Sequence, residues 1–200
     1  MQLMHSNTPL DSLEIMRAQQ RMGRNEDNFR IAEFKTNYPH IERNHRYRLA
    51  PNQGQSIRVG DFLIAKRALV ATNPNFIELP PTGDFGTPTD FVAGLVGPGY
   101  FDNVRFPAVD ILPIFDNDED VVYEGVAKDF VPGSLSNLLT AANYETFLLQ
   151  PVTLFQLPYG TVGYRGRTQY VNLANIVAGN KFEVDRIDPF TGSVWFKLIQ

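Results

Sequence analysis

The chain contains no cysteine. It therefore cannot form a disulfide framework, a thiol nucleophile or a thiolate zinc site. At 200 residues it is long enough to bury a sizeable core, so neither a disulfide nor a metal is needed for folding. A reducing cytoplasm is compatible with this composition, although the lack of cysteine does not identify a compartment.

Long apolar runs are missing as well. No stretch approaches the roughly 20 apolar residues that span a bilayer. The first twenty residues, MQLMHSNTPLDSLEIMRAQQ, are interrupted by polar side chains and by Pro9, so they lack the apolar core of a signal peptide. We expect a soluble protein with no signal peptide, no transmembrane segment and no membrane partner.

The chain also lacks an excess of positive charge. Its formal net charge is −4, and the charge is unevenly distributed. Residues 1–48 carry eight Lys and Arg against six Asp and Glu, whereas the remainder carries ten against sixteen. General affinity for nucleic acid comes from clustered Lys and Arg, so the acidic remainder argues against nucleic acid as a partner.

Residues that could form a catalytic site are few. The three histidines, His5, His40 and His45, all lie in the N-terminal quarter. Ser134 stands in PGSLS, which lacks the second glycine of a nucleophile elbow. We find no grouping of a nucleophile, a base and an orienting residue, and we expect no enzymatic activity and no cofactor.

The clearest structural pattern is a C-terminal β-hairpin in KFEVDRIDPFTGSVWFKLI, residues 181–199. Apolar and polar residues alternate on both sides of a turn at residues 188–192. The returning strand places Trp195 on one face and Val194 and Phe196 on the other, and all three are apolar. Both faces of this strand should therefore be covered, either by a second sheet or by another subunit.

Further short strands precede the hairpin. The pattern predicts extended segments in residues 57–72, 76–79, 91–96, 104–115, 121–123, 152–157 and 169–176. Ten Pro and Gly residues between positions 73 and 99 predict long loops around brief strands. We expect a mainly β fold, with an antiparallel β-sandwich or barrel-like body over residues 49–200.

One helix is expected in the body, and a second in the N-terminal extension. Ser134 has the chemistry of a helix cap, and leucines at helical spacing predict a helix over about 134–149 that Pro151 ends. Residues 1–48 resemble an extended, partly helical arm, with a helix from about Ser12 to Met22. The apolar patch from Phe29 to Tyr38 could be one short strand or the end of this arm. The apolar stripe of this helix is short, so a loosely attached arm is the favoured interpretation, and an arm that gains order by contacting a neighbouring subunit or partner is the alternative.

Two loops are candidate ligand sites. Asp116, Asp118 and Asp120 occupy the first, third and fifth positions of a calcium loop, but Val121 and Ala127 replace its glycine and its final glutamate. A solvated acidic loop is the favoured interpretation, and calcium is the weaker one. In YGTVGYRGRTQY, residues 159–170, the interleaved Tyr and Arg could bind a polyanion or a protein, although a flexible crossing between strands is favoured.

The segment RVGDFLIAKRALV, residues 58–70, with the Gly- and Pro-rich loops after it, resembles the small β-domains of head decoration, or cement, proteins of tailed bacteriophages. The absence of cysteine and the polar arm are also typical of phage structural proteins. This resemblance implies a virion structural protein, located on the capsid, that forms a homo-oligomer such as a trimer. Its partners would be like subunits and a major capsid or other virion protein.

The residues expected to contact neighbouring subunits are apolar residues of the arm and the single tryptophan of the hairpin: Leu10, Leu13, Met16, Phe29, Ile31, Phe34, Tyr38 and Trp195. One alternative is a carbohydrate- or receptor-binding domain of a tail or adhesion module. Its binding face would be formed by aromatic loops around Phe76, Phe85, Tyr100 and Phe101. A further alternative is a nucleic-acid-binding module using Arg43, Arg46, Arg48, Arg165 and Arg167.

Overall fold

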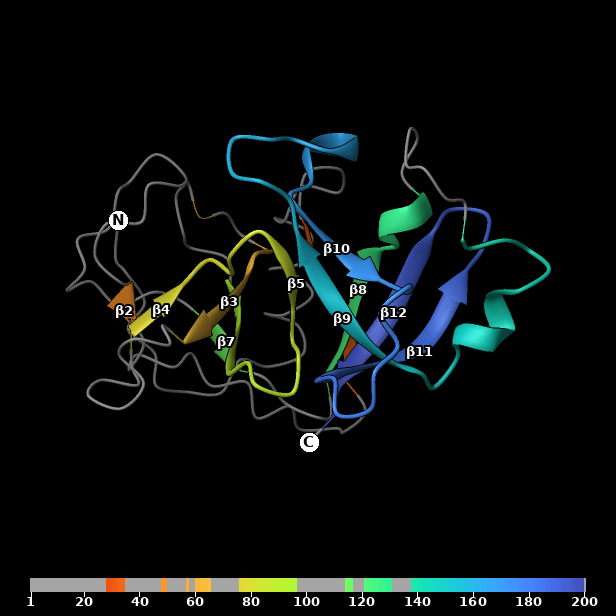
Figure 1. Cartoon of the computed structure of the whole chain (residues 1–200), viewed down its shortest axis with the longest axis horizontal. Coiled ribbons are helices and arrows are strands. Elements are labelled where there is room, and N and C mark those ends of the chain that lie inside the picture. The colour runs from red at the N-terminus through yellow and green to blue at the C-terminus, as the bar shows by residue number, and fades with distance from the viewer. Residues whose placement is uncertain are drawn as a thin grey trace.

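The computed structural model describes residues 28–34, 48–49, 57, 60–65, 76–96, 114–116, 121–130 and 138–199. Over these residues the fold is mainly β, with two antiparallel sheets in a sandwich-like arrangement, which confirms the predicted fold class. The small sheet lies on the left of Figure 1 and the large sheet on the right. The predicted arm helix at Ser12–Met22 lies outside the described residues.

The large sheet has seven strands. Six of them follow in the order β1 (Arg30–Phe34), β8 (Val121–Val126), β12 (Ser193–Leu198), β11 (Phe182–Asp188), β9 (Pro151–Gln156) and β10 (Gln169–Asn172). The seventh strand, β5 (Gly83–Phe85), pairs with β9. A single parallel bridge from Ala127 to Val171 links the end of β8 to β10, but the sheet does not close on itself.

The small sheet has five strands in the order β2 (Arg48–Leu49), β4 (Phe76–Glu78), β3 (Phe62–Ala65), β6 (Val92–Val96) and β7 (Ile114–Asp116). Its pairs are antiparallel except that of β2 with β4. Every residue of β3 is buried, so this strand is covered on both faces. Residues 104–113 of the predicted strand at 104–115 lie outside the described residues.

The predicted C-terminal hairpin is confirmed. Strands β11 and β12 pair antiparallel from Phe182 opposite Leu198 to Asp188 opposite Ser193. Val194 and Phe196 are completely buried on the inner face, whereas Trp195 on the outer face is half-buried. The alternation seen in the sequence therefore corresponds to one core face and one partly covered face.

An aromatic cluster joins the two sheets. Phe62 comes from β3 of the small sheet, and its ring packs edge-on against rings of the large sheet. The centroid distances are 4.9 Å to Tyr123 and 5.4 Å to Phe182. Such edge-to-face pairs add to the stabilisation from burial, so this cluster holds the sheets together.

The helix predicted over 134–149 is wrong for its described part. Residues 138–149 form turns and one short 3-10 helix, η3 (Tyr144–Phe147). The Asn143 side chain accepts the Thr140 N–H at 2.7 Å and donates to the Leu138 carbonyl at 2.6 Å. These are backbone groups that an α-helix would use, and a competing side chain of this kind disfavours a helix.

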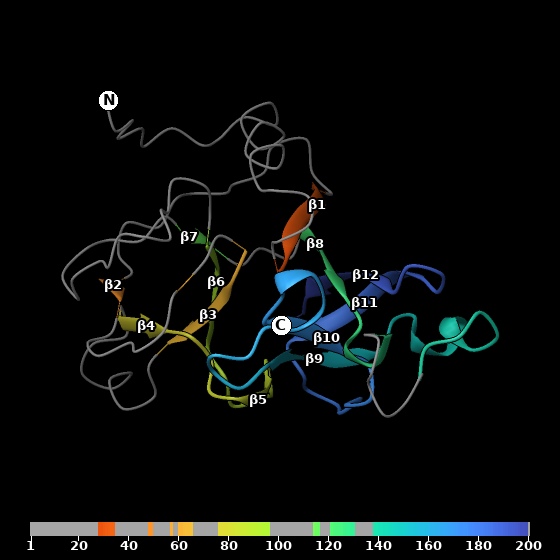
Figure 2. The ribbon, with the colours of Figure 1, turned by 90° about the horizontal axis from the view of Figure 1, so that it is seen from above.

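The segment just before β1 lies against both sheets. Strand β1 pairs with β8 at the edge of the large sheet, as Figure 2 shows from above. Phe29, which immediately precedes β1, is 1% exposed and its backbone N–H donates to the Gly60 carbonyl at 3.1 Å. Part of the segment assigned to the arm is thus built into this core. The proposed boundary at residue 48 stays a prediction.

Candidate interaction surfaces

The predicted contact residues fall in three kinds of place. Leu10, Leu13, Met16 and Tyr38 lie outside the described residues. Phe34 ends strand β1, and only its backbone is described. Phe29 and Ile31 are buried in the hydrophobic core, and Trp195 lies half-buried on the outer face of the large sheet.

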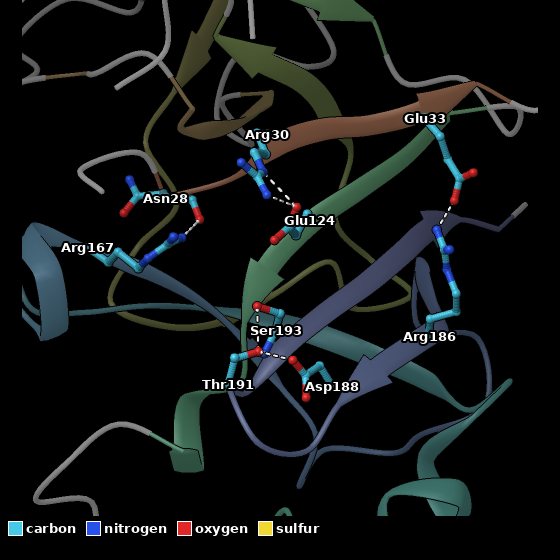
Figure 3. A network of polar contacts seen from close by, with 9 residues as sticks. All are labelled: Asn28, Arg30, Glu33, Glu124, Arg167, Arg186, Asp188, Thr191 and Ser193. Carbon is cyan, nitrogen blue, oxygen red and sulfur yellow. Dashed lines mark hydrogen bonds and ion pairs between the residues drawn. The ribbon is translucent and has the colours of Figure 1, made fainter. Parts of the chain in front are cut away.

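Asn28 forms the polar part of this buried region. Its amide nitrogen donates to the Asp61 carboxylate, and its amide oxygen accepts the Gln169 N–H at 3.0 Å. The Arg167 guanidinium donates to the Asn28 backbone carbonyl, a contact that is drawn in Figure 3. Asn28 is 2% exposed, and buried polar groups need such partners, so these bonds fix the residue in place.

The outer face of the large sheet carries paired charges around Trp195. Arg30 on β1 pairs with Glu124 on β8, and Lys197 on β12 pairs with Glu183 on β11 at 2.9 Å. Arg186 pairs with Glu33 of β1, and its guanidinium lies over the Trp195 ring, 5.4 Å from the centroid. Figure 3 shows the Arg30–Glu124 and Arg186–Glu33 pairs. The cation covers part of the indole that was expected to contact a neighbouring subunit.

The loop between β9 and β10 is anchored at several points. The Tyr159 hydroxyl donates to the Pro80 carbonyl at 2.6 Å, and the Gly163 N–H donates to the Arg167 carbonyl at 2.9 Å. Arg165 has a left-handed backbone with φ of 53°, and its guanidinium lies 5.0 Å from the Tyr164 centroid. Arg165 is exposed, whereas Arg167 is turned toward Asn28. One of the two arginines considered for polyanion binding is therefore engaged within the protein.

Buried Tyr170 supports this loop from below. Burial raises the pKa of its phenol, while a hydrogen bond to the Tyr164 carbonyl and the charge of Arg167 act in the opposite direction. Gly163 lies directly over the Tyr170 hydroxyl, and a Cβ at this position would overlap with that oxygen. A side chain at position 163 would thus displace the loop from Tyr170.

The tip of the β11–β12 hairpin presents the most exposed large apolar side chain among the described residues. Phe190 is 81% exposed. The Asp188 carboxylate accepts the Phe190 N–H at 2.9 Å and the Thr191 hydroxyl at 2.6 Å. These bonds lower the pKa of Asp188, the Thr191 hydroxyl contributing most. The Thr191 bonds to Asp188 and Ser193 are drawn in Figure 3.

Gly192 completes the turn. Its φ of 69° is in the left-handed region, and a Cβ there would overlap with the Phe130 ring. Its N–H donates to the Asp188 carbonyl at 2.9 Å, and its own carbonyl accepts the Ala127 N–H at 2.8 Å. The turn is therefore fixed to the end of β8, and Phe190 projects from a rigid support.

The acidic loop considered as a calcium site lies mostly outside the described residues. Asp116 ends β7 with only its backbone described, and Asp118 and Asp120 lie outside the described residues. The described parts of the chain contain no group of three His, Cys, Asp or Glu able to hold a metal ion. In the same parts, no helix has the length and apolar character to cross a membrane.

Of the aromatic residues considered for glycan binding, only Phe85 has a described side chain. Phe85 is completely buried, and Phe76 is described only by its backbone in β4. Tyr100 and Phe101 lie outside the described residues. Sequence reasoning missed Phe190 as a surface residue, although its position within a DPFTG turn, where side chains point to solvent, was a usable signal.

Comparison with known proteins gives no relative. No protein-family model matches the chain, and neither the curated proteins nor the solved structures contain a significant match. The fold and the surfaces described above are therefore the basis for any functional proposal.

Proposed function

We propose that this chain is a non-enzymatic structural protein of a virion, in the class of bacteriophage head decoration or cement proteins. It would bind like subunits and a major capsid or other virion protein. The observation that carries the proposal is the exposure of Phe190, at 81%, on a turn held by Asp188. Covering an exposed aromatic ring with a partner lowers the free energy of the complex. A rigid support keeps the entropic cost of binding low.

Charge supports a protein partner for the hairpin tip. The ionised Asp188 carboxylate lies two residues from Phe190 and the chain has a net charge of −4, so an anionic lipid surface would repel this region. A protein pocket with an apolar floor and a basic rim would complement both groups. The carbohydrate and nucleic-acid alternatives lose support, because Phe85 is in the core and Arg167 is bound to Asn28.

The proposal is tested by the mass of the protein in solution. Light scattering of the full chain should give a particle heavier than one chain of 22.6 kDa, and Phe190→Ser should shift the particle toward the single-chain mass. Val162→Ser, at another exposed apolar position, is the matched control and should leave the mass unchanged. A wild-type protein that keeps the single-chain mass at high concentration contradicts the proposal.

A further inference from the structure

Residues 28–33 pack against residues that lie far from them in the chain. The surface that these distant residues form is called the seat. Their hydrogen bonds and ion pairs include contacts with residues 60, 61, 124, 167–169 and 186. The sequence separations reach from 31 residues for Phe29 and Gly60 to 153 for Glu33 and Arg186. The seat is therefore formed by the body of the protein, and none of these contacts depends on the local chain connection.

The floor of the seat fits one aromatic side chain. The Phe29 ring packs against Phe62 at 5.2 Å and Phe196 at 5.4 Å between centroids. It lies over Gly125, where a Cβ would be 2.6 Å from two atoms of the ring. Protein interiors are close-packed, and the glycine at position 125 of β8 leaves the space that the Phe29 ring fills.

The rim of the seat is complementary in charge. Arg30 faces Glu124 across the β1–β8 pair, and Glu33 reaches Arg186 of β11. The seated strand thus offers a cation and an anion to groups of opposite sign. β1 is also an edge strand whose only strand partner among the described residues is β8, so its removal would break one pairing in the sheet.

We propose that residues 28–34 form an exchangeable strand, and that the seat accepts the same segment from a second copy of the chain. An identical strand from a neighbour would meet the same Gly125 floor, the same Asn28 partners and the same charges, which is the basis of domain swapping. This inference rests on the proposed assembly of like subunits. It assigns to β1 a contact between like subunits that adds to the one proposed for Phe190.

The absence of cysteine permits a direct cross-linking test. Arg30→Cys and Glu124→Cys place thiols on facing residues of β1 and β8, on separate copies of the full chain. The two variants are co-expressed, purified together and treated with a short thiol-reactive cross-linker. An exchanged strand yields a two-chain product in which mass spectrometry identifies a link from position 30 to position 124, which in this mixture joins different chains.

The matched control uses the hairpin. Glu183→Cys and Lys197→Cys also face each other and also lose an ion pair, but β11 and β12 stay within one chain. This co-expressed pair should give no link from position 183 to position 197. The double variant Arg30→Cys/Glu124→Cys reports whether the thiols can react at all.

Light scattering of the same samples separates the two proposals. A multi-chain particle that lacks the 30-to-124 link, while the double variant cross-links within single chains, overturns strand exchange and leaves the proposed assembly standing. A single-chain mass without the link overturns both. A multi-chain particle with the link, together with an unlinked hairpin control, supports strand exchange.

Discussion

At the scale of single residues, the Gln169 side chain makes the pair of backbone hydrogen bonds that a neighbouring strand would otherwise make. Its side chain accepts the Phe62 N–H at 2.8 Å and donates to the Phe62 carbonyl at 3.1 Å. It also donates to the Gln156 side chain at 2.9 Å. One side chain on β10 of the large sheet thereby pairs both backbone groups of a residue on β3 of the small sheet.

Replacing Gln169 by leucine should destabilise the protein strongly. Gln169→Leu leaves the buried N–H and carbonyl of Phe62 without these partners, and each unsatisfied group costs about 1–3 kcal/mol. We expect the free energy of unfolding in urea to fall by about 2–4 kcal/mol. Gln150→Leu, at a half-buried position outside this network, is the control and should change the stability much less. Equal losses for the two variants would contradict the assigned role.

Replacing Thr153, on the adjacent strand β9, should instead increase the free energy of unfolding. The residue is completely buried, and its hydroxyl has no hydrogen-bond partner among the described residues. Valine has nearly the same shape without the hydroxyl, so Thr153→Val should raise the unfolding free energy by about 1 kcal/mol. Thr168→Val removes a hydroxyl bonded to Asn28 and should lower it. A loss of stability in Thr153→Val would show that its hydroxyl is satisfied.

Asp188 should titrate below its ordinary pKa of 3.8. The Thr191 hydroxyl and the Phe190 N–H stabilise the ionised form, so the folded pKa is lowered. The resulting stabilisation of the turn is present above the unfolded pKa and is lost as the pH falls through the folded pKa. A carboxyl NMR titration should give a midpoint below 3.8, and Thr191→Val should raise it. Ser193→Ala, which retains both bonds to Asp188, should have little effect.

At the scale of elements, the predicted C-terminal hairpin forms, whereas the described part of the predicted helix at 134–149 does not, and the two depend on different interactions. The alternation around residues 182–198 predicts the hairpin because each residue's face follows from local geometry. The spacing of leucines in 135–149 also suits a helix, yet Leu139 and Phe147 are buried in the core through turns and η3. The bonds of Asn143 and the packing against the sheet override helix propensity there, and neither is visible in spacing alone.

The same contrast applies to the candidate surfaces. The sequence indicates that Trp195 lies on the second face of its strand, as the structure has it, but gives no sign that Arg186 covers the ring. It leaves Phe29 either in a short strand or at the end of the arm, because the residues that surround Phe29 in space, such as Phe196, lie far away in the chain. Contacts between residues this far apart in the chain depend on the order of the strands in the sheet, which the periodicity of the sequence does not determine.

The end of the 138–149 segment carries a testable strain. Leu149 has φ of 60° and is 66% exposed, an unusual combination for a bulky residue. Asparagine tolerates the left-handed region, so Leu149→Asn should raise the unfolding free energy by about 0.5–1 kcal/mol, less than the full cost of that conformation for an L-residue. Leu149→Ile should lower it, because a β-branched residue fits this conformation poorly. A gain in stability for the isoleucine variant would contradict this explanation.

At the scale of the whole molecule, the two sheets share one interior. Phe62 of β3 packs into the aromatic cluster of the large sheet, and Gln169 of β10 binds the backbone of the same residue. Asn28 and Phe29 add contacts to Asp61 and Gly60 next to β3. Separating the sheets would expose these rings and leave these polar groups unpaired at the same time.

The sheets should therefore unfold as one cooperative unit. Trp195, the single tryptophan, reports on the large sheet by fluorescence, and amide exchange of β3 reports on the small sheet. The free energies from urea unfolding of Trp195 and from exchange of Leu63 and Ile64 should agree, because local opening of β3 would break the shared core. Gln169→Leu should lower both by the same amount. Exchange of β3 at a clearly lower free energy than the Trp195 transition would contradict this coupling, and it would restrict the role of Gln169 to the small sheet.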